Sequence, residues 1–228
     1  MILYKNDLLK QIFNKQIKDV DASFYLTVIN RYYNHLIDIP QYSAEYIITK
    51  MKKTQNYTLF IEEMNLLEDS ILYKSEVHGE EHIIRVCIFA YYLAYLKKLP
   101  RNMIIDILEV AKYHDIGRIN DKEDRDHGFR GAMLYGQYFT NKKSEKNMYG
   151  AIITAHSMRD EEFDMVWQQW NNPIEKLDYG KMIFNIIKDA DALDRFRLND
   201  CSLKTQFLHS KEALQLIRAA YELYHLYH

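Results

Sequence analysis

Apolar residues recur every three or four positions along most of the chain, which is the spacing of a helix with one buried face. Few residues interrupt this pattern: the 228 residues include 7 glycines and 3 prolines, too few for the turns of many short strands. The pattern predicts an all-α protein without internal repeats. The expected helices cover 22–37, 43–53, 58–67, 80–98, 103–114, 127–139, 145–156, 160–170, 174–190 and 211–226.

The chain becomes more apolar from about residue 75, where helices are expected over 80–98 and 103–114, and the second of these is apolar on most of its sides, which is typical of a helix inside a bundle. The second of them ends in the sequence HDIG, and we expect Gly117 to end it in the left-handed conformation. Residues 118–126 follow, with seven charged residues of nine, and are expected to form a solvated loop.

Charge and length exclude several classes of protein. Lysine and arginine number 30 against 32 aspartates and glutamates, without the basic excess that nucleic-acid binding requires. The uncharged apolar stretch from Val86 to Leu96 has 11 residues, whereas about 20 span a bilayer. The first residues mix charges into their apolar positions, unlike a secretion signal, and Cys87 and Cys201 form no CxxC pair. We therefore expect a cytoplasmic protein that binds neither nucleic acid nor membranes.

Histidines are concentrated in one part of the chain, since five of the nine fall between residues 78 and 156. His78 and His82 are four residues apart and would share one helix face. His114 and Asp115 close an apolar helix, where a carboxylate is costly unless a cation compensates it. Asp191 also ends an apolar helix, where its charge opposes the helix dipole. These residues are either metal ligands or hydrogen-bonded groups at helix ends.

Five segments of this chain, in this order, resemble the HD superfamily of metal-dependent phosphohydrolases. They are HGEEHIIRV (78–86), HDIGR (114–118), DHGFRGA (126–132), TAHS (154–157) and KDADALDR (188–195). The resemblance implies an HD-type metal-binding helical domain over 71–228, ending in additional C-terminal helices, with a helical extension over 1–70 packed on it.

The resemblance also implies a metal centre of one or two divalent ions, with Fe, Mn, Zn, Mg, Ni and Co as the candidates. The ligands that it implies are His82, His114, Asp115, His127, His156 and Asp191. In the two-ion form Asp115 would bridge both ions, since a carboxylate has two oxygens.

The implied activity is hydrolysis of a small phosphoester, a nucleotide or a related phosphomonoester or phosphodiester, by metal-activated water. Asp115 would be catalytic and His78 would lie beside the centre. Arg118 and Arg195 would contact phosphate, because the planar guanidinium binds it in bidentate fashion. The chain has HDIGR where relatives that cleave cyclic dinucleotides have HDIGK, and it has no GYP segment, which disfavours that substrate.

Two alternatives remain open from the sequence. A di-iron oxygenase of the same superfamily uses a similar ligand set, and a non-catalytic regulatory module would keep the fold alone. The aromatic residues of the terminal helices either complete the core or form the surface of a homodimer. The remaining histidines are expected at the surface: His35, His209, His225 and His228.

Overall fold

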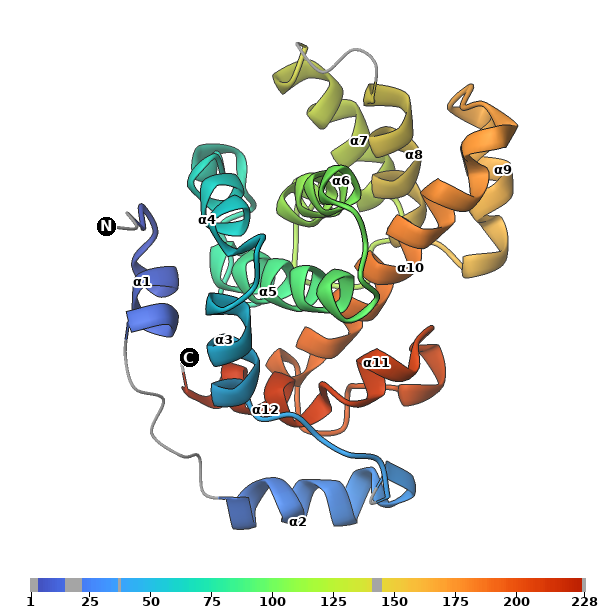
Figure 1. Ribbon diagram of the computed structural model, residues 1–228. Coiled ribbons are helices and arrows are strands. Elements are labelled where there is room, and N and C mark those ends of the chain that lie inside the picture. Colours follow the sequence, from blue (N-terminus) through green and yellow to red (C-terminus); the bar gives the residue numbers. More distant parts are fainter. Residues whose placement is uncertain (1–3, 15–21, 37, 141–144, 227–228) are drawn as a thin grey trace.

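The computed structural model describes residues 4–14, 22–36, 38–140 and 145–226, and this part of the chain is all-α, with no strand. Figure 1 shows its helices, none of which is long and apolar enough to cross a membrane. The α-helices are α1 (Asp7–Asn14), α2 (Ala22–Tyr32), α3 (Ala44–Lys52), α4 (Tyr57–Asn65), α5 (Glu80–Leu96), α6 (Arg101–Tyr113), α7 (His127–Tyr138), α8 (Lys146–His156), α9 (Phe163–Gln169), α10 (Leu177–Leu193), α11 (Lys211–Leu214) and α12 (Ile217–Leu226). The 3-10 helices are η1 (Asn34–Leu36), η2 (Asp69–Ile71), η3 (Asp160–Glu162), η4 (Ile174–Lys176), η5 (Asp194–Arg197) and η6 (Thr205–Phe207).

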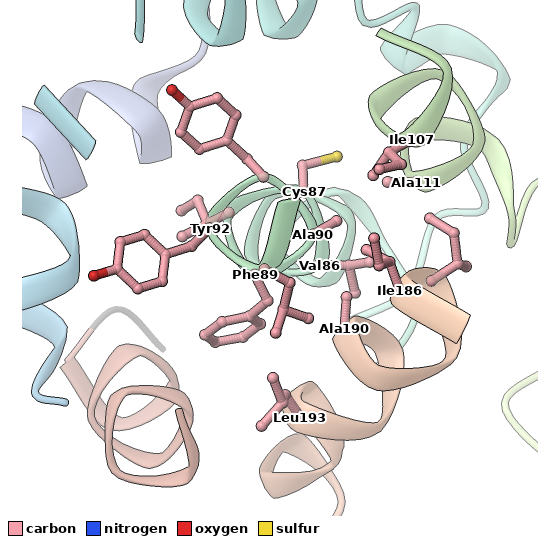
Figure 2. Close-up of a cluster of buried hydrophobic side chains, with 14 of the residues drawn as sticks. Val86, Cys87, Phe89, Ala90, Tyr92, Ile107, Ala111, Ile186, Ala190 and Leu193 are labelled. Atoms are coloured by element: carbon pink, nitrogen blue, oxygen red, sulfur yellow. The ribbon is translucent and has the colours of Figure 1, made fainter. Parts of the chain in front are cut away.

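Helix α5 lies at the centre of the bundle, and every residue from His82 to Ala94 is buried. Because its side chains are apolar on nearly all sides, it is stable only when other helices surround it. It packs against α6 and α10, and Figure 2 shows α5 with residues such as Ile107 of α6 and Ile186 of α10 around it. The alignment of these three helices fixes where their ends meet.

The N-terminal helices cover this centre. Helix α1 packs on α5, α3 on α12 and α4 on α6. Aromatic rings fill the contacts, as where the ring centroids of Tyr25 and Tyr221 lie 6.0 Å apart and those of Phe196 and Tyr221 lie 5.4 Å apart. Tyr221 is fully buried, so this part of the aromatic set completes the core. The division into 1–70 and 71–228 stays a prediction, and so does a homodimer.

The sequence pattern does not predict helix α1. Its apolar positions, Leu9, Ile12 and Phe13, span little more than one turn, which is too short for a helical period to stand out. Tertiary packing supplies the missing stabilisation. The Phe13 ring lies 5.5 Å from that of Tyr57 and 5.8 Å from that of Phe60, both on α4.

The prediction of one continuous helix over 211–226 is wrong, because the structure divides this range into α11 and α12. The segment that precedes α3 takes up the backbone groups at the break. The Gln41 side chain donates to the Leu214 carbonyl at 2.8 Å and accepts from the Arg218 N–H at 3.2 Å. The Tyr42 N–H donates to the Gln215 carbonyl at 2.9 Å. The interruption therefore follows from contacts that are distant in the sequence.

We expect Phe89→Ala to lower the free energy of unfolding by about 3–5 kcal/mol, because Phe89 is fully buried on α5 and the loss of its ring leaves a cavity in the core. The matched control is Leu66→Ala, at a side chain that is 64% exposed, with an expected change of about 0.5 kcal/mol or less. Urea denaturation at equilibrium measures both. Equal shifts in the two variants would contradict the central position of α5.

Candidate metal centre

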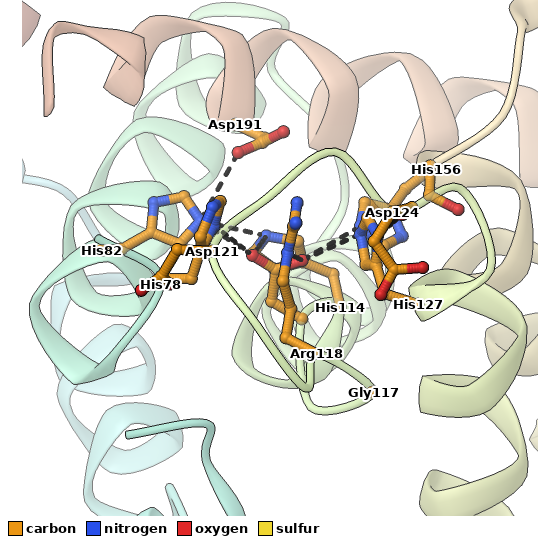
Figure 3. A network of polar contacts seen from close by, with 12 residues as sticks. His78, His82, His114, Gly117, Arg118, Asp121, Asp124, His127, His156 and Asp191 are labelled. Carbon is orange, nitrogen blue, oxygen red and sulfur yellow. Dashed lines mark hydrogen bonds and ion pairs between the residues drawn. The ribbon is translucent and has the colours of Figure 1, made fainter. Parts of the chain in front are cut away.

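All six predicted ligands lie together, at or near the ends of five helices (Figure 3). His82 is in the first turn of α5, His127 begins α7, His156 ends α8 and Asp191 is in the last turn of α10. His114 and Asp115 directly follow α6. All are buried except Asp191, whose side chain is 28% exposed. Residues that are far apart in the sequence thus meet, because each helix that carries one of them has its first or its last turn at this place.

Four donor atoms form a first donor group: His82 Nε2, His114 Nε2, Asp115 Oδ2 and Asp191 Oδ1. The His82 Nε2 atom lies 3.3 Å from His114 Nε2, 3.5 Å from Asp115 Oδ2 and 3.4 Å from Asp191 Oδ1. Donors that bind one cation at about 2.0–2.2 Å lie about 3.0–3.6 Å from one another. The distances from His82 Nε2 therefore match those of a coordination shell, while His114 Nε2 lies somewhat farther from Asp115 Oδ2, at 3.8 Å.

Three atoms form a second donor group on the other side of the same carboxylate. Asp115 Oδ1 lies 3.1 Å from His127 Nε2 and 3.4 Å from His156 Nε2, and the two imidazole nitrogens are 2.9 Å apart. Asp115 thus directs one oxygen into each group. That is the arrangement of a carboxylate that bridges two cations.

Hydrogen bonds to the other ring nitrogen orient each of the four imidazoles. The Nδ1–H of His114 donates to the Ala111 carbonyl at 2.9 Å, and that of His156 to the Ile153 carbonyl at 2.6 Å. His127 donates in the same way to the Asp124 carbonyl, and the three bonds share one pattern, a carbonyl three residues earlier in the chain. His82 Nδ1 donates to Asp194 Oδ2 at 2.8 Å. In this tautomer each Nε2 carries a lone pair.

The donor chemistry fits a cation. Two pairs of Nε2 lone pairs face each other, His82 with His114 and His127 with His156, and such pairs repel unless a positive ion lies between them. Protons do not fill this role at His114 and His156. Burial lowers the pKa of His114 to about 3, and burial also lowers the pKa of His156. Groups such as His82, His114 and Asp191 could therefore hold a metal ion.

Asp115 keeps its negative charge inside the protein. Burial by itself raises the pKa of a carboxyl group, but the imidazoles around it, His114 foremost and then His127, His156 and His78, hold the pKa of Asp115 well below its ordinary value. Arg118 adds a further donor, with its Nε 3.2 Å from Asp115 Oδ1. His78 lies beside the first donor group, where its Nδ1 is 3.1 Å from Asp115 Oδ2.

Asp194 is a residue of this site that the sequence analysis missed. Its side chain is fully buried and binds His82 through Oδ2, while Arg85, also fully buried, donates from Nε to Oδ1 at 2.6 Å. A carboxylate behind a ligating histidine fixes the ring and strengthens it as a ligand. One signal was present in the sequence: Asp194 follows Asp191 by three residues, which places both on one helix face.

The two arginines of the segment 195–197 differ from expectation. Arg195 is exposed, and its Nε donates to the Ser202 carbonyl at 3.2 Å, although it lines the cavity described below. Arg197, which the sequence analysis did not single out, has a side chain only 4% exposed. Its Nη2 lies 3.4 Å from Asp191 Oδ1 and 3.4 Å from His78 Nδ1. Arg197 is thus the arginine of this segment next to the first donor group.

The expected conformation of Gly117 is wrong, because no described glycine has a positive φ. Position 117 requires a glycine for a different reason, which is the space around it. A Cβ on Gly117 would lie 2.1 Å from the His127 carbonyl oxygen and 2.2 Å from the Gly131 nitrogen, both backbone atoms of α7. The glycine lets the turn after Asp115 lie directly on the start of α7. That contact brings His127 to Asp115.

A cavity of about 1060 Å³ opens over the donor groups. His78, His127, His156 and Asp191 contribute to its lining, so the site is accessible to a small molecule. Most of the remaining polar wall is charged, with more basic than acidic side chains. The basic ones are Arg118, Lys122, Arg125, Arg159, Lys188, Arg195, Arg197 and Lys204.

No protein-family model, no curated protein sequence and no solved structure matches this chain. The donor geometry and its chemistry are therefore what supports a metal centre here.

We expect Asp194→Asn to weaken the binding of Mn²⁺ or Zn²⁺ about 10–100-fold, because the His82 ring loses the carboxylate that orients it. Titration against a chelating dye measures the affinity, and circular dichroism checks that the variant is folded. The control is Asp178→Asn, at an exposed aspartate in the first turn of α10. Unchanged affinity in a folded Asp194→Asn protein would contradict this role.

Proposed function

We propose that this protein is a metal-dependent phosphohydrolase of the HD type that acts on a small phosphoester. One observation carries the proposal: two groups of buried donors share the two oxygens of Asp115, with the imidazole lone pairs facing inward. The order of the five resembling segments along the chain gives the same assignment independently of that geometry.

His82, His114, Asp115 and Asp191 would hold one divalent cation, and His127 and His156 would hold a second with Asp115 as the bridge. Imidazole and carboxylate ligands suit iron, manganese and zinc among the divalent ions. A pair of such ions supplies an activated water molecule and neutralises phosphoryl oxygens.

The residues of the chain itself would bind and orient the substrate. The Arg118 guanidinium is anchored by Asp115 at Oδ1 and by the Lys122 carbonyl, 3.3 Å from its Nη1, so it is held at the edge of the site. A guanidinium fixed in this way binds a phosphoryl group with little further loss of conformational freedom. Arg195, at the exposed wall, would contact the substrate farther from the centre, and His78 would orient Asp115.

The cavity favours an anionic substrate. The whole chain has a net charge of −2, but basic side chains outnumber acidic ones in the cavity lining. An anion is therefore attracted to this face although the chain as a whole is slightly acidic. A phosphoester such as a nucleotide suits this wall because it is an anion.

We expect the protein loaded with Mn²⁺ or Fe²⁺ to hydrolyse at least one member of a panel of phosphomonoesters and phosphodiesters, with phosphate or alcohol release as the measurement. Asp115→Asn should lower kcat/KM by at least about 1000-fold, because one side chain serves both donor groups. Asp164→Asn, at a side chain that is 51% exposed, is the control with an expected unchanged rate.

Three results would overturn the proposal and separate it from the alternatives. A metal-loaded protein that hydrolyses nothing in the panel but consumes O₂ with a small molecule would be a di-iron oxygenase. A protein that binds no metal and keeps its structure after His114→Ala would be a regulatory module. Hydrolysis that survives Asp115→Asn at full rate would place the activity elsewhere.

A further inference from the structure

A second polar cluster lies beside the cavity and outside the donor groups. Its centre is His209, whose side chain is 18% exposed. The ring lies between two carboxylates: Nδ1 is 3.1 Å from Asp189 Oδ1, and Nε2 is 3.0 Å from Asp160 Oδ2. Asp189 is 1% exposed, and it also accepts from the His209 backbone N–H at 2.6 Å and from Ser210 Oγ at 2.6 Å.

This arrangement requires a protonated ring. Carboxylate oxygens are acceptors, so each ring nitrogen of His209 must carry a hydrogen to bond both Asp189 and Asp160. A neutral imidazole has only one N–H, and its other nitrogen would face a carboxylate with a lone pair. Deprotonation therefore removes one of the two bonds and replaces it by a repulsion.

The cluster connects the cavity wall to the ligand-bearing helices. The segment before His209 supplies the cavity residues Lys204, Gln206 and Phe207. Asp189 precedes Asp191 on α10. Asp160 is bound at 3.1 Å by Lys188, whose Nζ also donates to the carbonyls of His156 at 3.3 Å and Met158 at 2.9 Å. His209 thus ties residues 198–208 to α10 and to the end of α8.

We propose that protonated His209 is a positioning residue that clamps the wall formed by residues 198–208 against the cavity, and that this clamp opens as the ring loses its proton. The charged groups that face the cluster are Asp189 and Lys188 from α10 and Asp160 from η3, and the Phe184 ring lies 6.3 Å from that of His209. The carboxylates of Asp189 and Asp160 outnumber the one ammonium group of Lys188, so the charges around His209 favour its protonated form.

The direction of the pH effect follows from these contacts. The hydrogen bond with Asp189, the largest influence, and the charges of Asp189 and Asp160 raise the pKa of His209 above its ordinary value, against the effect of burial. The clamp is then fully formed below the ordinary histidine pKa of about 6.5 and is lost as the pH rises through the raised value. The wall is closed at the acidic end and open at the alkaline end.

Amide hydrogen exchange, corrected for the intrinsic rate at each pH, tests this from about pH 6 to about pH 9 at constant metal concentration. In the natural protein we expect the amides of residues 198–208 to lose protection about tenfold or more with rising pH, the effect of losing one charge-assisted hydrogen bond. The amides of α5 serve as the internal reference and should show no such change. The readout does not use activity, so it is independent of the proposed function.

Variants identify the group responsible. His209→Gln should give low, pH-independent protection of 198–208. Asp160 has a side chain that is 41% exposed, so its substitution should leave the fold intact. Asp160→Asn should also abolish the pH dependence, because the neutral ring then faces one carboxylate and one amide and keeps both hydrogen bonds. The matched control is His35→Gln: His35 contacts Thr205 Oγ1 at 2.9 Å in the same segment, but a hydroxyl suits a neutral ring, so the pH dependence should remain. A pH dependence unchanged in His209→Gln and Asp160→Asn, or absent from the natural protein, would overturn the proposal.

Discussion

The structure depends on one buried carboxylate. Asp115 is 2% exposed at the point where α6, α8 and α10 end and α5 and α7 begin, and a charge in that position is unfavourable unless other groups compensate it. Five imidazoles, including that of His78, and the Arg118 guanidinium surround it, yet four of these imidazoles present lone pairs to one another in pairs. Cations between the carboxylate and the rings would remove the repulsion between these lone pairs, and the groups around Asp115 could hold them.

Each of the four ligand imidazoles is oriented by a backbone carbonyl or by a second carboxylate. These partners lie on several helices, so the site depends on the whole fold and not on a single loop. Three histidines use a carbonyl three residues earlier, which a histidine at a helix end or a turn has within reach. His82 has no such carbonyl partner and is held by Asp194, which in turn needs the buried Arg85. The close contact at Gly117 completes the arrangement by placing the start of α7 against the turn after α6.

The all-α class was predictable from the sequence, because apolar periodicity is a local signal. The meeting of His82, His114, Asp115, His127, His156 and Asp191 was anticipated by the order of the five segments. The break between α11 and α12 was not predictable, because it depends on Gln41, far away in the sequence. Arg197 was missed for a similar reason, because it belongs to no motif and its contact with Asp191 shows only in the fold. His209 was expected only as a surface histidine, because its contacts with Asp189 and Asp160 also join residues far apart in the sequence.

The central claim is that each oxygen of Asp115 serves a separate cation. Anomalous diffraction from crystals grown with Mn²⁺ tests it most directly. The account predicts two peaks about 3.5–4 Å apart, one on each side of Asp115, the first among His82, His114 and Asp191 and the second beside His127 and His156. No peak at Asp115 in crystals that contain Mn²⁺ elsewhere, or one peak remote from these histidines, would contradict it.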